Sequence, residues 1–187
     1  MYTLTPMRAF FAFKPKPEIC LNIESWRRLN WPLLARPVPV ANYHMTLAFL
    51  GDINEPQLEA LIDKTSTLEL PSFKLTLDTT GFWSKTGILW LGPSTPPAAL
   101  NQLAQALGSV ASSCQLPVAR SQFKPHLTLA RRVNPPPGAP LQLPEFSCAC
   151  SSFALFESSQ GKHGVSYHTV AEWALHPSAG KRQLNQS

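Results

Sequence analysis

Two short segments of the chain carry the same arrangement of a histidine and a threonine. HMTLAFL begins at His44 and HLTLA begins at His126, so that Thr46 and Thr128 each follow a histidine by two positions. With 12 threonines and 26 leucines in 187 residues, two of five histidines followed by x-Thr-Leu would arise by chance in roughly one such sequence in a thousand. The repetition therefore indicates a paired site rather than two ordinary strand histidines.

A pair of histidines suits acid and base catalysis at phosphorus. In an in-line displacement, one group takes a proton from the attacking oxygen, and another group on the far side gives a proton to the leaving oxygen. Imidazole has an unperturbed pKa of about 6.5 and can fill either role near neutrality. The two threonine hydroxyls would donate hydrogen bonds to the non-bridging phosphate oxygens as negative charge accumulates there. This scheme requires no metal.

Strand geometry would put each histidine on the same face as its threonine, because successive side chains of a strand point to opposite sides. Met45 and Leu47 would share the other face of the first strand, and Leu127 and Leu129 would share that of the second. These apolar pairs can anchor the strands to helices. Two such strands, placed together, would line a cleft with two histidines and two hydroxyls.

The rest of the chain alternates between strand and helix patterns. We expect strands over residues 9–13, 44–52, 73–83, 87–93, 123–132, 146–158 and 165–175. We expect helices over residues 17–29, 54–70 and 97–113. A proline-rich loop, NPPPGAP, follows the second histidine strand, and the turn-forming SQGKHG separates the last two strands.

The order of a short apolar strand, a helix and a His-x-Thr strand occurs twice. The two histidines are 82 residues apart (126 − 44), which is nearly half the chain and indicates an internal duplication of an α+β unit. We expect one bilobal domain over residues 1–187, with repeats at approximately 8–85 and 86–176 and a polar tail at 177–187.

Composition narrows the classes of protein further. A net charge of +5 and a pI near 9.2 favour anionic ligands, although a solvated basic face explains such a charge about as often as a nucleic-acid site does. The longest apolar stretches are far below the roughly 20 residues of a membrane-spanning helix, and no secretory signal begins the chain, so that we expect a cytoplasmic protein without a membrane partner. Four cysteines, at positions 20, 114, 148 and 150, form no Cys-x-x-Cys pair, which predicts reduced, mostly buried thiols and no metal site.

Beyond these patterns, several segments resemble one known family. HMTLAFLGD and FKPHLTLAR resemble the paired signatures of the two-histidine (2H) phosphoesterase superfamily, and within it the RNA 2′,3′-cyclic phosphodiesterases, also called 2′-5′ RNA ligases. RAFFAF resembles the opening strand of that family, FKLTLDTTGFW and ILWLG its central hairpin, and YHTVAEWAL its closing strand. The similarity covers about residues 8–176.

The resemblance implies an α+β fold of two pseudo-symmetric lobes, each an antiparallel sheet with helices on its outer face, around a central basic cleft. The implied reaction is hydrolysis of an RNA or nucleoside 2′,3′-cyclic phosphate to a 2′-phosphate, without cofactor or metal. We expect a monomer, because a small bilobal enzyme needs no partner subunit. In reverse, the same site could join a cyclic phosphate to a 5′-hydroxyl and form a 2′-5′ linkage.

By the family pattern, His126 is the proton acceptor that activates water and His44 is the proton donor to O3′. Taken alone, the two similar strands leave these roles interchangeable. The resemblance assigns phosphate binding to Thr46, Thr128 and Arg131. Counting along an ideal strand puts Arg131 on the face opposite His126, so that a twist or bulge is needed to turn it inward.

Four aromatic residues are candidates for stacking on a base, although packing in the core is the favoured interpretation of each. They are Phe13, Phe49, Trp83 and Tyr167. Lys124 falls on the histidine face by strand counting, but many relatives have a histidine nearby, and this departure leaves its role open.

Two alternative functions stand beside the phosphodiesterase. The first is a nucleotide- or RNA-binding module that uses the same cleft without turnover. The second is a metal hydrolase with the histidines as ligands, which lacks an Asp or Glu at ligand spacing near either motif.

Overall fold

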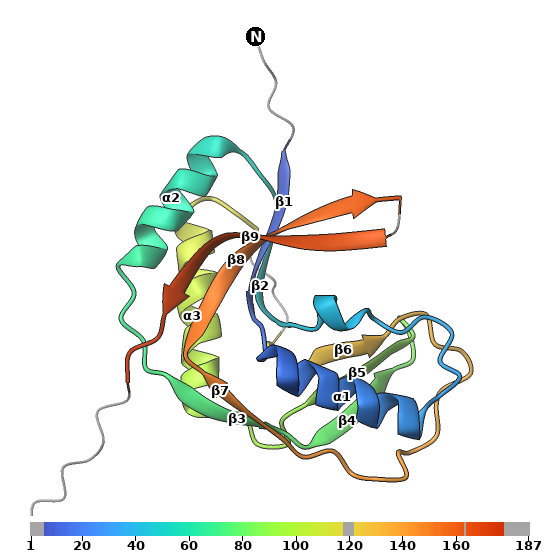
Figure 1. The fold of residues 1–187 in the computed structure, drawn as a ribbon. Helices are drawn as coiled ribbons and strands as arrows, with labels where there is room; N and C mark the ends of the chain where they lie inside the picture. Colours follow the sequence, from blue (N-terminus) through green and yellow to red (C-terminus); the bar gives the residue numbers. More distant parts are fainter. Residues whose placement is uncertain (1–5, 118–121, 163, 178–187) are drawn as a thin grey trace, which may run out of the picture.

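The computed structural model describes residues 6–117, 122–162 and 164–177, and shows an α+β protein built on antiparallel strands (Figure 1). The helices are α1 (Pro17–Asn30), α2 (Glu55–Ser66), α3 (Ala98–Ser113) and the short 3-10 helix η1 (Val40–Asn42). The strands are β1 (Met7–Phe13), β2 (Met45–Ile53), β3 (Phe73–Leu77), β4 (Thr79–Trp83), β5 (Ile88–Gly92), β6 (Leu127–Ala130), β7 (Phe146–Cys150), β8 (Ser152–Gly161) and β9 (Gly164–Ala174).

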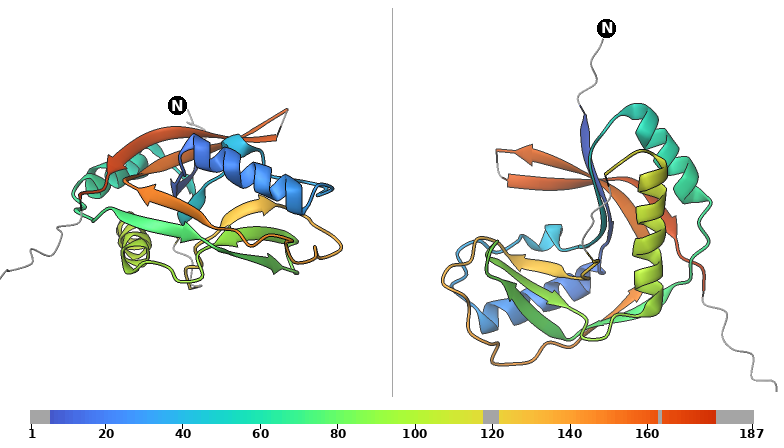
Figure 2. Two further views of the ribbon diagram at one scale, coloured as in Figure 1. Left: turned by 60° about the horizontal axis from the view of Figure 1, so that its bottom comes forward. Right: turned by 180° about the vertical axis from the view of Figure 1, so that it is seen from behind.

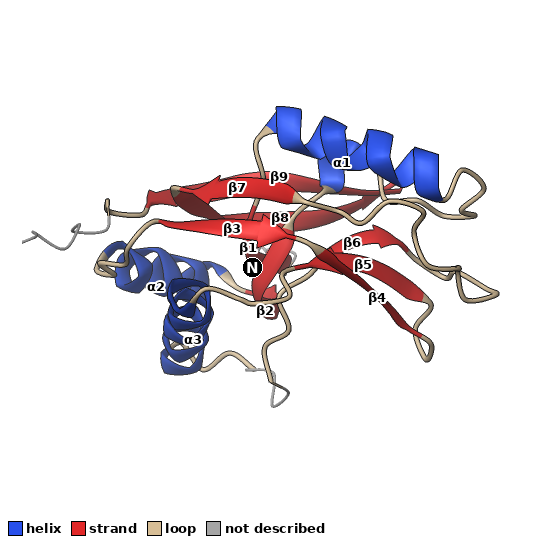
Figure 3. Ribbon diagram, turned by 90° about the horizontal axis from the view of Figure 1, so that it is seen from below, coloured by secondary structure: helices blue, strands red, loops and turns tan. Residues whose placement is uncertain are grey.

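Seven of these strands form one sheet in the order β4-β5-β6-β2-β1-β8-β9, and β3 pairs with β7 in a second sheet. Every named strand pair is antiparallel. Figure 3 shows α1 on one side of the strands and α2 and α3 on the other, and Figure 2 shows the same layers from two further directions. The predicted α+β fold with antiparallel sheets is confirmed.

The local sequence explains where the helices begin. The Asn54 side chain accepts from the backbone N–H of Gln57 at 2.9 Å, and the Gln57 side chain accepts from the Asn54 N–H at 3.0 Å, which forms a capping box for α2. Pro17 opens α1, where its missing N–H has no cost.

The order of elements is consistent with two copies of one unit. In the first half α1 joins the paired strands β1 and β2, and in the second half α3 joins the paired strands β5 and β6. The following strands then cross over, because β4 lies beside β5 and β8 lies beside β1, while β3 and β7 pair with each other. The internal repeat itself stays a prediction, and the predicted polar tail lies outside the described residues from position 178 onward.

Two predicted strands are divided in the structure, and one is shorter. Residues 73–83 break at Asp78, and residues 146–158 break at Ser151, because β3 and β7 form the small sheet while β4 and β8 join the large one. The Asp78 carboxylate stabilises the first of these breaks, because it accepts hydrogen bonds from the backbone N–H and the hydroxyl of Ser94, both at 2.6 Å. The strand predicted to begin at residue 123 begins at Leu127, after a proline that cannot donate to a ladder.

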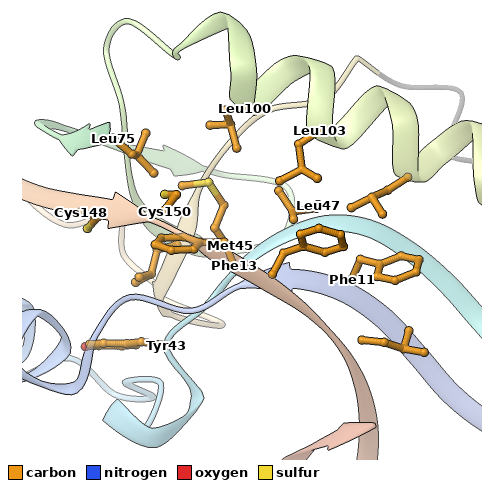
Figure 4. Close-up of a cluster of buried hydrophobic side chains, with 14 of the residues drawn as sticks. Phe11, Phe13, Tyr43, Met45, Leu47, Leu75, Leu100, Leu103, Cys148 and Cys150 are labelled. Carbon is orange, nitrogen blue, oxygen red and sulfur yellow. The ribbon is translucent and has the colours of Figure 1, made fainter. Parts of the chain in front are cut away.

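The core lies on the side of β1 and β2 that faces α3. Figure 4 shows Phe11, Phe13, Met45 and Leu47 packed near Leu100 and Leu103 of that helix, and all six are at most 5% exposed. The four cysteines are buried and free, as predicted. Among the described residues, no helix combines the length and the apolar character that a membrane span requires.

Candidate active site

The two histidine strands are neighbours at the centre of the large sheet. β2 and β6 meet at one residue pair, Met45 opposite Leu127, and the side chains of both are buried, at 1% and 0% exposure. Because side chains alternate along a strand, the residues on either side of this pair point to the other face of the sheet. The four polar motif residues therefore surround one point.

Antiparallel pairing fixes how these four residues face one another. Continued by one residue on either side of the central pair, this register puts His44 opposite Thr128 and Thr46 opposite His126, with each histidine directly before the first residue of its strand. The two histidines are then diagonal neighbours, with Cα atoms about 7–8 Å apart. Imidazoles at that separation can reach opposite sides of a single phosphorus atom.

Both imidazoles are held by backbone carbonyls in the same manner. Nδ1 of His44 lies 2.7 Å from the carbonyl oxygen of Asn42, and Nδ1 of His126 lies 2.7 Å from that of Lys124. A carbonyl can only accept, so each Nδ1 carries the proton and donates it. Nε2 of each ring is therefore the atom that is free to take or give a proton.

Aromatic rings flank each histidine from its own half of the sheet. The ring of Trp83 stands edge-to-face on His126 with centroids 4.6 Å apart, and Tyr167 stands edge-to-face on His44 at 4.8 Å. Phe10, which sequence reasoning missed, lies 5.0 Å from the His44 ring. These contacts limit the orientation of both imidazoles.

A β-bulge follows the threonine in each strand. The register of β2 against β1 slips at Leu47, between Thr46 and Ala48, and that of β6 against β5 slips at Leu129. A bulge shifts the alternation of the side chains that follow it. A shift of this kind is what the ideal-strand count required to bring Arg131 to the face of His126.

Electrostatics supports this position of Arg131. Its positive charge lowers the pKa of both His44 and His126, which indicates that the guanidinium lies within electrostatic range of the two rings. Its backbone N–H donates to the carbonyl oxygen of Arg36 at 3.0 Å, and the next residue, Arg132, adopts a left-handed φ of 53°. These two features fix the chain where the strand ends.

The two histidines are poorly basic in the free protein. Burial is the main cause that lowers the pKa of His44 to about 4; the Asn42 carbonyl opposes it, and the charges of Arg131, His126 and Lys14 add to it. Burial also lowers the pKa of His126, with the Lys124 carbonyl opposing and Arg131 adding. A bound phosphate anion acts in the opposite direction, because it stabilises the protonated imidazole.

A buried network on α1 anchors the residue that precedes His44. The Tyr43 hydroxyl donates to Glu24 Oε2 at 2.9 Å, and Arg27 donates to both oxygens of the same carboxylate at 2.7 Å. The hydrogen bond from Arg27 is the main cause that lowers the pKa of Glu24 to about 2, whereas burial, assisted by Glu24, raises the pKa of Tyr43. Tyr43 is fully buried, at 0% exposure.

The segment before His44 has two further tethers. Lys14 Nζ donates to the Ala41 carbonyl at 2.8 Å, and the Asn42 side chain donates to the Val165 carbonyl of β9 at 2.8 Å. The Glu24-x-x-Arg27 spacing signals a helical ion pair in the sequence. Nothing local in the sequence connects that pair to Tyr43.

The remaining stacking candidates differ in exposure. Phe49 is 65% exposed and can meet a ligand. Phe13 is only 4% exposed and packs in the core beside Met45, so that the prediction of a stacking role for Phe13 is wrong. Phe13 lies on the face of β1 that points away from the histidines.

Within the described ranges, no cluster of three or more His, Cys, Asp or Glu residues is arranged to hold a metal ion. The site itself contains five polar groups. These are two imidazoles with free Nε2 atoms, two threonine hydroxyls and one guanidinium.

Comparison with known proteins gives consistent matches. A family model described as the 2′-5′ RNA ligase superfamily matches residues 15–162. A protein of Escherichia coli (strain K12) named RNA 2′,3′-cyclic phosphodiesterase is 37% identical over 176 residues, which cover 91% of this chain and 97% of that protein. A protein of the same name from Thermus thermophilus is 30% identical over 189 residues, covering 95% and 94%.

Solved structures match as well. E. coli LigT in its apo form has a TM-score of 0.85 at 35% identity, covering 92% of this chain and 99% of that one. E. coli LigT complexed with 3′-AMP has a TM-score of 0.85 at 35% identity, covering 91% and 98%.

Proposed function

The chain belongs to the 2′-5′ RNA ligase superfamily, and we propose on this basis that it hydrolyses RNA or nucleoside 2′,3′-cyclic phosphates to 2′-phosphates. Relatives that cover nearly all of the chain bear the name RNA 2′,3′-cyclic phosphodiesterase. The observation that carries the proposal is the pairing of Met45 with Leu127, because it gathers both histidines and both threonines around one point.

The reaction divides the proton transfers between the two Nε2 atoms. His126 takes a proton from water as the water oxygen attacks phosphorus, and His44 gives a proton to O3′ as the bond from phosphorus to O3′ breaks. The product carries a 2′-phosphate and a 3′-hydroxyl, and proton exchange with solvent returns both rings to their starting states. This assignment of donor and acceptor follows the family pattern.

Phosphate binding prepares His44 for the donor role. With a pKa of about 4 in the free protein, this ring is neutral at pH 7. The negative charge of a cyclic phosphate between the rings raises the pKa of both, which favours the protonated imidazole that a proton donor needs. In this scheme His44 is the protonated ring of the complex and His126 the neutral one, as the donor and acceptor roles require.

Thr46, Thr128 and Arg131 hold the phosphate. The hydroxyls donate to non-bridging oxygens, and the guanidinium offsets the charge that grows on them in the transition state. All of these groups come from one chain, so that a monomer is sufficient. The reverse reaction, joining to a 5′-hydroxyl, competes with water at about 55 M and requires the second RNA end to be held in place.

The test is incubation with 2′,3′-cyclic AMP in excess EDTA, with the products separated by chromatography. We expect 2′-AMP as the product, at a rate that chelation leaves unchanged. Loss of activity in EDTA would contradict the metal-independent mechanism. Tight binding of the nucleotide with no turnover would instead identify a binding module.

A further inference from the structure

Lys14 directly follows the last residue of β1 and lies beside His44. The register of β1 against β2 ends with Phe13 opposite Met45, and its continuation by one residue puts Lys14 opposite His44. Residues that are opposite in an antiparallel pair share a face of the sheet, with Cα atoms about 4.5–5.5 Å apart. The lysine therefore leaves β1 on the same face as the imidazole.

Contacts around His44 agree with this placement. Lys14, His44 and Tyr167 line one small space of about 10 Å³, which is enough for about one water molecule and has no room for a nucleobase. The Nζ atom of Lys14 donates to the carbonyl oxygen of Ala41 at 2.8 Å, while the side chain is otherwise exposed to solvent. Burial is the main cause that lowers the pKa of His44, and the charge of Lys14 adds to it. The ammonium group thus lies at the surface beside this histidine.

The positive charge of Lys14 is available to a ligand. Within the ranges that the structure describes, the ion pairs join Glu24 to two arginines of α1, and Lys14 forms none. An ammonium group retains further N–H donors after the Ala41 carbonyl has accepted from one of them. Arg131 already has a place in the proposed reaction as a partner of the cyclic phosphate, whereas Lys14 has none. A second anionic group of the substrate could therefore bind here.

The geometry of the reaction puts the ribose on this side of the site. Water attacks phosphorus from the side of His126, and O3′ leaves on the side of His44. The ribose carries O3′, and C3′, C4′ and C5′ lead from it to O5′. A phosphate on O5′ is the next anionic group along the substrate, and it lies on the His44 side together with the ribose.

We propose that Lys14 binds the phosphate on O5′ of the nucleotide that carries the cyclic phosphate. In RNA this group is the diester that joins the terminal nucleotide to the preceding one, and in a mononucleotide it is a 5′-phosphate. The inference rests on the proposed function, including the role of His44 as the donor to O3′. It makes Lys14 a determinant of specificity that favours RNA ends and 5′-phosphorylated nucleotides over nucleoside 2′,3′-cyclic phosphates.

The experiment compares kcat/KM for three substrates at about 50 and 200 mM salt. They are 2′,3′-cyclic AMP, the same nucleotide with an added 5′-phosphate, and the dinucleotide UpA with a terminal 2′,3′-cyclic phosphate. We expect both substrates with a phosphate on O5′ to be better by about fivefold at the lower salt, as suits one exposed ionic contact. The gain should appear mainly in KM, because the contact is made equally in the ground state and the transition state.

Salt and substrate length identify the source of the gain. One phosphate contact should lose about threefold in affinity between the two salt concentrations, following the single-strand dependence of log affinity on log salt. Equal kcat/KM for all three substrates would overturn the proposal. A gain for the dinucleotide alone would also overturn it, because the added nucleoside rather than the phosphate would then be recognised.

Variants assign the contact to one side chain. Lys14→Met should bring the ratio of kcat/KM with and without the 5′-phosphate close to one, and Lys14→Arg should keep most of it. The ratio cancels any effect of the lost Ala41 contact, since both substrates share it. Lys16→Met is the matched control, because Lys16 is exposed and carries the same charge but does not line the space beside His44. An unchanged ratio in Lys14→Met, or an equal loss in Lys16→Met, would overturn the assignment.

The proposed function fails by a different result. If none of the three substrates is hydrolysed, the cyclic phosphodiesterase assignment itself is wrong. Hydrolysis of 2′,3′-cyclic AMP without a gain from the 5′-phosphate refutes only the role of Lys14.

Discussion

His44 and His126 bind the backbone in the same way, each through an Nδ1 atom 2.7 Å from the carbonyl oxygen two residues earlier in the chain. Both rings thus present Nε2 to the same face of the sheet, and neither is hydrogen-bonded to a carboxylate of the described residues. The two rings are held alike by these carbonyls, but they differ in how deeply they are buried and in which charged groups lie near them. The contribution of each histidine to the reaction can be measured separately.

Removing either imidazole should abolish most of the activity. For His44→Ala and His126→Ala we expect kcat for 2′,3′-cyclic AMP to fall by roughly 10²-fold or more, because a positioned acid or base is lost. Steady-state kinetics on each variant tests this. His168→Ala, at an exposed position on β9, is the control and should keep the parent rate. A rate near that of the parent in either site variant would contradict the mechanism.

The pH profiles of kcat and kcat/KM should both be bell-shaped but displaced from each other. Profiles of kcat/KM report the free enzyme, in which burial depresses the pKa of both histidines. Profiles of kcat report the complex, in which the phosphate anion raises both pKa values. We therefore expect the limbs of the kcat profile at higher pH. Coincident profiles would show that the bound anion does not act on these rings.

Stability should fall as the pH is lowered from 6.5 toward 4.5. The pKa of His44 is about 4 in the folded protein and about 6.5 when unfolded, so that below pH 6.5 protons bind the unfolded state preferentially. The full difference corresponds to roughly 3 kcal/mol of unfolding free energy, most of it lost within this window. Urea unfolding at several pH values should show a flatter dependence for His44→Gln. Glu24 does not interfere, because its lowered pKa acts below about 4.5.

Arg131→Gln should raise KM for cyclic nucleotides and lower kcat/KM by about 10-fold or more, since a charge-assisted bond to phosphate is lost. Arg132→Gln is a close control, because the neighbouring arginine is also exposed and carries the same charge. Equal effects of the two arginine variants would indicate a loss of general positive charge rather than a specific contact.

Thr46→Val and Thr128→Val should each cost about 1–3 kcal/mol in transition-state binding.

Tyr43→Phe should destabilise the protein and slow the reaction without a matching change in KM. The variant removes a buried hydrogen bond to a carboxylate, worth about 1.5–3 kcal/mol, and loosens the residue next to His44. Thermal unfolding and kinetics measure the two effects. Lys16→Ala, at an exposed position outside this network, provides the baseline. A stability loss with kcat unchanged would confine the role of Tyr43 to folding.

Much of the fold and of the candidate site could be predicted from the sequence, because both depend on local patterns. Strand alternation put each histidine with its threonine, and helix signals at Pro17 and Asn54 fell where the helices begin. The breaks at Asp78 and Ser151 could not be predicted. The strand pattern of the sequence continues across each break, so that it gives no sign that the chain passes from one sheet to the other.

Other features depend on pairing between distant segments. The bulges at Leu47 and Leu129 depend on the register of β2 against β1 and of β6 against β5, and the sequence of one strand alone does not determine that register. The contact of Tyr43 with Glu24 joins residues 19 positions apart through the fold. Phe13 was a plausible stacking residue by type, but the face it occupies is set by the neighbouring strand.

The backbone contact between β2 and β6 is confined to the pair Met45 and Leu127. A rotation displaces atoms in proportion to their distance from the pivot. If the two parts of the sheet flex about this pair, the imidazoles beside it move least and the outer strands β4 and β9 move most. The spacing of the two Nε2 atoms is therefore the distance that such a motion would change least.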